Sequence, residues 1–424
     1  MSIYRKLFVG IIFVASQGAL LLHATDYLRE QQQRAFDVGQ AVWGHWGPRP
    51  DLYNNWNNHT NRLIPVYTFG ADLSRYRGAN SVYRDPQALF RLYGRVPKGT
   101  VNPTANYFDQ TQLHDLQKRA VDAGKKYIFL VIFDGMDWHT TRTAAAYRSG
   151  KSSYQAGRGS GLSFQDYRGA PTDFGFMVTS PHNTGTITDA DTQTITSAGG
   201  TAGGGYHSVL AGATPWARPL EPDYLTGRTL GWQHPFTDSA AAATAMASGI
   251  KTYNGSVNAT PYGSQIVPLP RELQAENNFS VGAVTSVPIS HATPACAYAN
   301  NVTRRDYQDL SRDMLGLPSS SHPRNALPGL DVLIGAGWGE NLATDPNQGT
   351  NYQPGNRYLT QTDLRTIRDR YEVVVRTSGE AGNTLLKAAA RRAVDRHRPL
   401  FGYFGTKWSH LPFQTADGSF NPVA

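Results

Sequence analysis

The chain has 424 residues, of which 40% are hydrophobic and 17% are charged, so it can bury a large core. Its formal net charge of +8 is spread along the sequence rather than gathered in one run, which favours small anionic substrates and argues against a nucleic-acid partner. The single cysteine, Cys296, excludes an intrachain disulfide and a thiolate metal cluster. Any metal would need oxygen and imidazole ligands.

The first 24 residues have the shape of an export signal. Arg5 and Lys6 precede an apolar run over residues 7–22, and no clean small-residue cleavage site follows it. The run is slightly short for a membrane span, so a cleaved signal and an uncleaved membrane anchor both stay open. In either case we expect the folded part to be exported, to the periplasm or the extracellular space.

Residues 25–120 are predicted to form an accessory N-terminal extension. Its first part is polar, and a segment rich in tryptophan, asparagine and proline follows. In residues 111–123 the apolar positions recur at helical spacing and Gly124 follows, which predicts an amphipathic helix. We place the catalytic domain at residues 121–424.

An unbroken apolar run over residues 127–133 predicts a buried central strand of a parallel sheet. Asp134 and Gly135 follow it directly. A carboxylate at the carboxyl end of such a strand either caps the next helix or lies at the edge where open α/β sheets bind ligands. The following 148–234 stretch is rich in glycine, serine and threonine, and we interpret it as an insertion near the active-site face.

Residues 239–248 are nearly all alanine, methionine, threonine or serine, and Gly249 follows them. This composition predicts a helix that ends at the glycine. Asp238 stands where a side chain caps the helix, and Ser239 lies in the first turn, where the helix dipole stabilises an oxyanion. The same residues are also typical of an ordinary helix cap.

Residues 279–287 predict another buried strand, and a turn leads from it into His291 and Thr293. Taken alone, these two side chains are typical of a loop. Further strands are predicted at residues 330–334 and 400–404, and a cationic helix at residues 385–396.

Three of these segments together resemble the alkaline phosphatases. Residues 237–255 resemble the family's nucleophile segment over nineteen consecutive positions, and residues 133–136 (Phe-Asp-Gly-Met) resemble its first metal-ligand segment. Residues 291–295 (His-Ala-Thr-Pro-Ala), with Arg304 thirteen residues beyond the histidine, match its phosphate-binding segment. The resemblance covers residues 121–424.

The resemblance implies a three-layer α/β/α sandwich with a largely parallel central sheet, incomplete at its C-terminus. It implies two Zn²⁺ ions and one Mg²⁺ ion. In the family, the residue at the Ser239 position is phosphorylated and ligates zinc, and the one at the Asp238 position helps to hold the substrate. Arg304 would bind the phosphate group of the substrate. The implied metal ligands are Asp134, Ser239, His291 and Thr293, and the choice of histidine rather than aspartate at position 291 would tune the third metal.

By this resemblance, the expected function is hydrolysis of small phosphate monoesters through a phosphoserine intermediate. The alternatives are a phosphodiesterase or sulfatase of the same superfamily, and a non-catalytic surface protein that binds phosphate. The family draws most of its metal ligands from later segments, and we find none of these after Gly339. We therefore expect residues 1–424 alone to be inactive. A homodimer is compatible with the sequence, which leaves the oligomeric state open.

Overall fold

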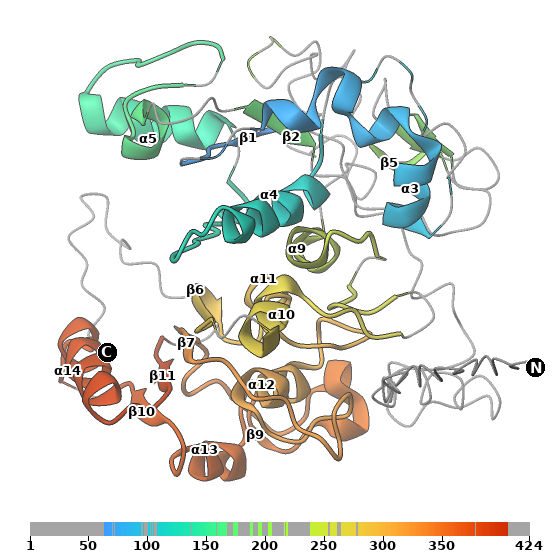
Figure 1. Cartoon of the computed structure of the whole chain (residues 1–424). Helices are drawn as coiled ribbons and strands as arrows, with labels where there is room; N and C mark the ends of the chain where they lie inside the picture. The colour runs from blue at the N-terminus through green and yellow to red at the C-terminus, as the bar shows by residue number, and fades with distance from the viewer. Residues whose placement is uncertain are drawn as a thin grey trace, which may run out of the picture.

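The computed structural model describes most of residues 63–167 and 238–405, together with short pieces between residues 173 and 218. The predicted export signal and the first part of the predicted extension, up to residue 62, lie outside the described residues, as does much of the predicted insertion. Among the described residues, no helix has the length and apolar character needed to span a membrane. Figure 1 shows a parallel sheet with its helices in one half of the molecule, and α4 beside α9 above it.

A four-stranded parallel sheet lies at the centre of the C-terminal half, with the strand order β10-β11-β7-β6. Its strands are β6 (Gly282–Pro288), β7 (Val332–Ala336), β10 (Glu372–Val375) and β11 (Leu400–Tyr403). Parallel neighbours need crossover connections, which the helices between these strands supply. The strands predicted around residues 279–287, 330–334 and 400–404 are confirmed as β6, β7 and β11.

The helices are short, and in chain order they are α3 (Pro86–Tyr93), α4 (Thr111–Asp122), α5 (Trp138–Ser149), α6 (Ser163–Asp166), α9 (Ser239–Ser248), α10 (Leu269–Glu276), α11 (Ala292–Ala295), α12 (Tyr307–Leu315), α13 (Gln361–Ile367) and α14 (Gly382–Asp395). Segments of 3-10 helix are η1 (Ser74–Tyr76), η2 (Gly78–Asn80), η3 (Val82–Arg84) and η5 (Pro346–Asn351), the last of which is kinked at Gly349. The other strands pair in antiparallel fashion. β1 (Leu63–Val66) pairs with β2 (Asp173–Phe176), and β8 (Asn341–Leu342) pairs with β9 (Gly355–Asn356). In a three-stranded sheet, β4 (Thr194–Thr196) lies between β3 (Ile187–Asp189) and β5 (Ala202–Gly205).

Helices cover both faces of the parallel sheet. On one face, Ala389 and Ala393 of α14 pack in a cluster with Leu400 of β11. The next residue of that strand, Phe401, points to the opposite face and belongs to the main core. Leu310 of α12 and residues of α11 and α13 belong to the same core. The predicted three-layer α/β/α arrangement is therefore confirmed for this part of the chain, with α14 on one side of the sheet and α11, α12 and α13 on the other (Figure 1).

The prediction of a buried central strand at residues 127–133 is wrong. The segment is not a strand, and its apolar side chains are largely exposed, at 81% for Tyr127, 84% for Phe129 and 69% for Val131. An apolar run forms a central strand only if strands on both sides take its backbone hydrogen bonds. In the described residues the parallel sheet ends at β6, and Ile132 alone of this segment packs against the main core.

The position of β6 corrects a second expectation. The sequence predicts a buried strand there, whereas β6 is an edge strand whose residues alternate between exposed and half-buried up to Pro288, with Val284 72% exposed. The apolar composition is the same for a central and an edge strand. Burial depends on the neighbours, which composition does not show.

Two buried carboxylates, Asp306 at the N-cap of α12 and Asp309 within the helix, hold the loop that leads to Arg304. The Asn301 side-chain amide donates to both Asp306 and Asp309, at 3.1 Å each, and the Ser320 amide donates to Asp309 at 2.8 Å. Burial is the main cause that raises the pKa of Asp309 to about 6. The pKa of Asp306 is also raised, first by burial and then by the Asp309 charge.

Because the pKa values of Asp306 and Asp309 are raised, we expect the free energy of unfolding to fall as the pH rises from about 4 to about 6. In that window the unfolded carboxyls have lost their protons while the folded ones keep them, so the unfolded state binds fewer protons and folding stability decreases with pH. Urea denaturation at a series of pH values measures this slope. Asp309→Asn should flatten it, and an unchanged slope in that variant would contradict the assignment. The side-chain amide that this variant carries at residue 309 would also face the Asn301 side-chain amide, which lowers stability equally at every pH. For this reason the slope with pH, and not the stability at one pH, is compared.

Candidate active site

The N-terminus of α9 carries the candidate nucleophile. The helix runs over Ser239–Ser248, as predicted, and Gly249 ends it in the left-handed conformation with φ of 69°. Asp238 is the N-cap, and its Oδ2 accepts a hydrogen bond of 2.9 Å from the Ala241 amide. This cap places the half-buried Ser239 at the first helical position, where the helix dipole stabilises negative charge on oxygen.

Arg304 joins these two side chains into one cluster. Its Nη1 donates to Asp238 Oδ1 at 3.0 Å and to Ser239 Oγ at 2.8 Å. Its side chain is 29% exposed, whereas that of Asp238 is 9% exposed. The structure thus brings Asp238, Ser239 and Arg304 together, although 65 residues separate the serine from the arginine.

Backbone contacts explain why Arg304 reaches this place. Val257 and Asn301 form an antiparallel bridge, with both of their amides donating across it. The Arg304 amide then donates to the Gly255 carbonyl at 2.6 Å, and the Gly255 amide donates to Asp238 Oδ2 at 2.8 Å. Gly255 has a φ of 85°, a conformation that favours glycine, so this glycine lets the chain contact the cap and the arginine together.

A second pair of predicted residues also meets. Thr293 Oγ1 donates to Asp134 Oδ2 at 2.8 Å, and 159 residues separate the two along the chain. Asp134 is exposed and Thr293 half-buried. Asp134 therefore contacts a second predicted metal ligand although the segment before it is not a strand.

His291 precedes α11 and lies in an aromatic and cationic environment. Its ring stacks on Tyr307 with a centroid distance of 5.6 Å and meets Tyr358 edge-on at 6.1 Å. Burial, then the positive charges of Arg304 and Arg357, lower the pKa of His291 to about 4. The imidazole is consequently neutral at pH 7.

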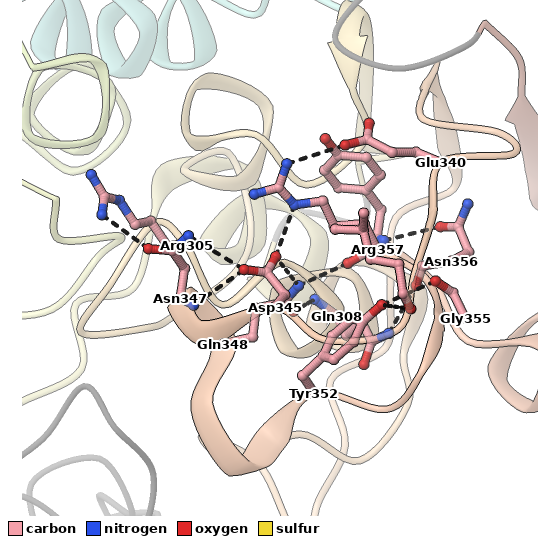
Figure 2. A network of polar contacts seen from close by, with 12 residues as sticks. Arg305, Gln308, Glu340, Asp345, Asn347, Gln348, Tyr352, Gly355, Asn356 and Arg357 are labelled. Atoms are coloured by element: carbon pink, nitrogen blue, oxygen red, sulfur yellow. Dashed lines mark hydrogen bonds and ion pairs between the residues drawn. The ribbon is translucent and has the colours of Figure 1, made fainter.

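Arg357 is a residue of this environment that the sequence analysis missed. Its guanidinium lies over the Tyr307 ring at 5.1 Å and forms ion pairs with Asp345 at 2.8 Å and Glu340 at 3.1 Å. Figure 2 shows Arg357 between these two carboxylates. No motif marks Arg357, because its partners come from two separate loops and only the fold brings them together.

The donor set offers hard oxygen ligands. The Asp134 carboxylate and the Thr293 hydroxyl are oxygen donors of the kind that Mg²⁺ prefers. Within the described residues, no group of three or more histidine, cysteine, aspartate or glutamate side chains could hold a metal ion. Of the predicted ligands, Asp134 and Thr293 therefore fit part of a magnesium shell, and the described residues do not supply the shells of two zinc ions.

Comparison with known proteins shows which family this part of the chain resembles. The alkaline phosphatase family model matches residues 224–404, a range that contains Asp238, Ser239, His291, Thr293 and Arg304. Residues 224–404, less than half of the chain, are thus similar to the alkaline phosphatases. Asp134 lies outside the matched range.

Curated proteins show the same similarity over part of their length. Alkaline phosphatase 4 of Bacillus subtilis is 31% identical over 143 residues, which are 34% of this chain and 28% of the relative. Alkaline phosphatase 3 of the same organism is 36% identical over 119 residues, 27% of this chain and 24% of the relative. Streptomycin-6-phosphate phosphatase of Streptomyces griseus is 28% identical, over 34% of this chain and 33% of the relative. The chain thus matches about a quarter to a third of the length of each.

Solved structures that are similar to the chain include alkaline phosphatases. The enzyme of the Antarctic bacterium TAB5 is 24% identical, with 43% of this chain and 44% of that chain covered and a TM-score of 0.29. A mutant of that enzyme with Mg bound is 22% identical, with 44% of each chain covered and the same TM-score.

Proposed function

We propose that the protein hydrolyses small phosphate monoesters through a phosphoserine formed on Ser239. The observation that supports this most is the contact of the Arg304 guanidinium with both Ser239 Oγ and the helix cap Asp238. A serine at a helix N-terminus beside a guanidinium is placed where an alkoxide and a phosphoryl group are both stabilised. The family match adds to this proposal from outside the geometry.

In the proposed first step, Ser239 Oγ attacks phosphorus, the bond between Oγ and phosphorus forms, and the bond to the ester oxygen breaks. The alcohol leaves with the proton that the serine hydroxyl gives up. Nη1 of Arg304 donates to Asp238 Oδ1 and Ser239 Oγ, and neither Nη2 nor Nε donates a hydrogen bond to a described residue, so these atoms can donate to two phosphoryl oxygens. Water then cleaves the phosphoserine and regenerates the hydroxyl.

For the metals, we propose that Asp134, Thr293 and His291 contribute to a Mg²⁺ site, and that Ser239 contributes to zinc binding. When bound, such ions would polarise phosphoryl oxygens and lower the pKa of the nucleophile. We also propose that the protein is exported, because residues 1–24 have the composition of an export signal.

The test is to detect the intermediate in the full-length protein. After brief incubation with p-nitrophenyl phosphate and an acid quench, mass spectrometry of the peptide with residue 239 should show one added phosphoryl group, and p-nitrophenol should be released. Phosphate binding without release of p-nitrophenol would instead identify a non-catalytic binding protein. Faster turnover of a phosphodiester or a sulfate ester than of the monoester would assign the chain to another member of the superfamily.

A further inference from the structure

A buried ion pair joins the region before α4 to the chain that follows α9. Lys251 Nζ lies 2.8 Å from Asp109 Oδ2, and the two side chains are 1% and 0% exposed. Lys251 comes two residues after Gly249, the residue that ends α9, and Asp109 comes two residues before α4 begins at Thr111. The ion pair therefore connects the N-terminal segment to the helix that carries Ser239.

Both members of the pair are held by further contacts. Asp109 Oδ2 also accepts a hydrogen bond of 2.5 Å from the Tyr83 hydroxyl, and its Oδ1 accepts from the Thr111 amide at 2.8 Å and from the Thr111 hydroxyl at 2.6 Å. The Lys251 amide donates to the Leu92 carbonyl at 2.8 Å. These contacts fix Lys251 through its main chain and through its ammonium group.

Four residues after Lys251, the chain reaches the candidate active site. The Gly255 amide donates to Asp238 Oδ2 at 2.8 Å, and its carbonyl accepts from the Arg304 amide at 2.6 Å. Gly255 thus contacts the cap of the nucleophile helix and the backbone of the phosphate-binding arginine at once. Lys251 and Gly255 are only four residues apart in the sequence.

The net stability that the pair provides does not explain its presence. Transferring two charges from water to the interior is costly, and burial is the main cause that lowers the pKa of Lys251. A neutral pair of similar volume is often as stable as a buried ion pair. What the charged pair adds is a defined geometry, because separating a buried ammonium from its carboxylate leaves an uncompensated charge in the interior.

We propose that the Asp109–Lys251 ion pair is a positioning element that holds Gly255, and through it Asp238 and Arg304, in the geometry that binds the phosphoryl group. The inference rests on the proposed function, since the site that it positions is the proposed phosphate site. It also assigns a role in the active site to residues of the predicted accessory extension. Asp109 and Lys251 touch no reacting atom in this scheme.

A second ion pair provides a matched control. Lys118 of α4 lies 3.1 Å from Glu272 of α10, and both side chains are partly exposed, at 46% and 31%. This pair also links α4 to the part of the chain that follows α9, yet neither residue contacts Asp238, Gly255 or Arg304 among the contacts of the described residues. Its loss should leave the phosphate site unchanged.

The experiment compares the full-length protein with Asp109→Asn/Lys251→Met, in which both charges are removed at similar volume. Three quantities are measured, which are the melting temperature, the dissociation constant for inorganic phosphate, and hydrogen exchange of the peptide that contains residues 250–256. We expect the double variant to melt near the parent, to bind phosphate about tenfold more weakly and to exchange this peptide about tenfold faster. Lys118→Met should melt near the parent, and its dissociation constant for phosphate and its exchange rate should stay within about twofold of the parent.

A folded double variant with unchanged exchange over residues 250–256 overturns the inference, and so does one with unchanged phosphate affinity. If the double variant does not fold, Lys251→Arg, which keeps a cation opposite Asp109 but changes the geometry of the pair, replaces it in the same three measurements. Loss of folding in both would make the pair a folding element and reject the positioning role. The exchange measurement tests the positioning role and does not depend on turnover. Absence of phosphoserine at residue 239 in the parent would reject the proposed function without deciding the positioning role.

Discussion

Replacing Ser239 by alanine should abolish phosphoenzyme formation and lower kcat/KM for p-nitrophenyl phosphate by roughly 10³-fold or more in the full-length protein. The substitution removes the oxygen that would bond to phosphorus. It leaves the helix intact, because alanine is a strong helix former and the Asp238 cap bonds to Ala241 rather than to Ser239. Arg304 keeps its contact with Asp238, so binding of inorganic phosphate should fall much less than turnover does.

Ser248 at the other end of α9 offers a control for loss of a hydroxyl. Its Oγ donates to the Thr244 carbonyl at 2.7 Å, a local bond within the helix. Ser248→Ala should therefore cost no more than about 1 kcal/mol in the free energy of unfolding and leave kcat within about twofold. If Ser239→Ala kept the turnover of the parent while Ser248→Ala lost it, the nucleophile would have been assigned to the wrong end of the helix.

Local signals in the sequence were sufficient for α9. The alanine-rich run, the cap at Asp238 and the glycine that ends the helix act over a few residues, so the bounds could be predicted without knowledge of the fold. The same holds for α4, predicted over residues 111–123 and observed over Thr111–Asp122. The roles of Ser239 and Arg304 were different, because they came from the resemblance, and the structure then placed the two side chains 2.8 Å apart.

Features that depend on distant neighbours could not be predicted. The run at residues 127–133 has the composition of a central strand, but in the described residues no strand takes its backbone hydrogen bonds. Arg357 shows the opposite case, since a single arginine in a loop carries no local signal and only the fold surrounds it with Glu340 and Asp345. Lys251 lies inside the matched nucleophile segment, yet its partner Asp109 is 142 residues earlier, so the sequence did not pair them.

Replacing Arg304 by alanine should weaken binding of inorganic phosphate by roughly 1–3 kcal/mol, the usual scale for a hydrogen bond to a charged group. The fold should persist, because the contact with Gly255 is made by the backbone amide of residue 304 and remains in the variant. Asp238 Oδ2 also keeps its bonds from Ala241 and Gly255. The loss should therefore show in the dissociation constant for phosphate and in KM, with little change in melting temperature.

Arg305 supplies the matched control for this variant. It has the same charge one residue along the chain, it is exposed, and its guanidinium contacts Asn347 rather than Asp238 or Ser239 (Figure 2). Arg305→Ala should change phosphate affinity by no more than about twofold, since an exposed charge is screened by solvent. Arg304→Lys should recover only part of the affinity, because an ammonium lacks the planar fork that binds two oxygens at once. If Arg305→Ala weakened phosphate binding more than Arg304→Ala, the phosphate-binding guanidinium would be that of Arg305, and the contact of Arg304 with Ser239 would be a feature of the ligand-free site alone.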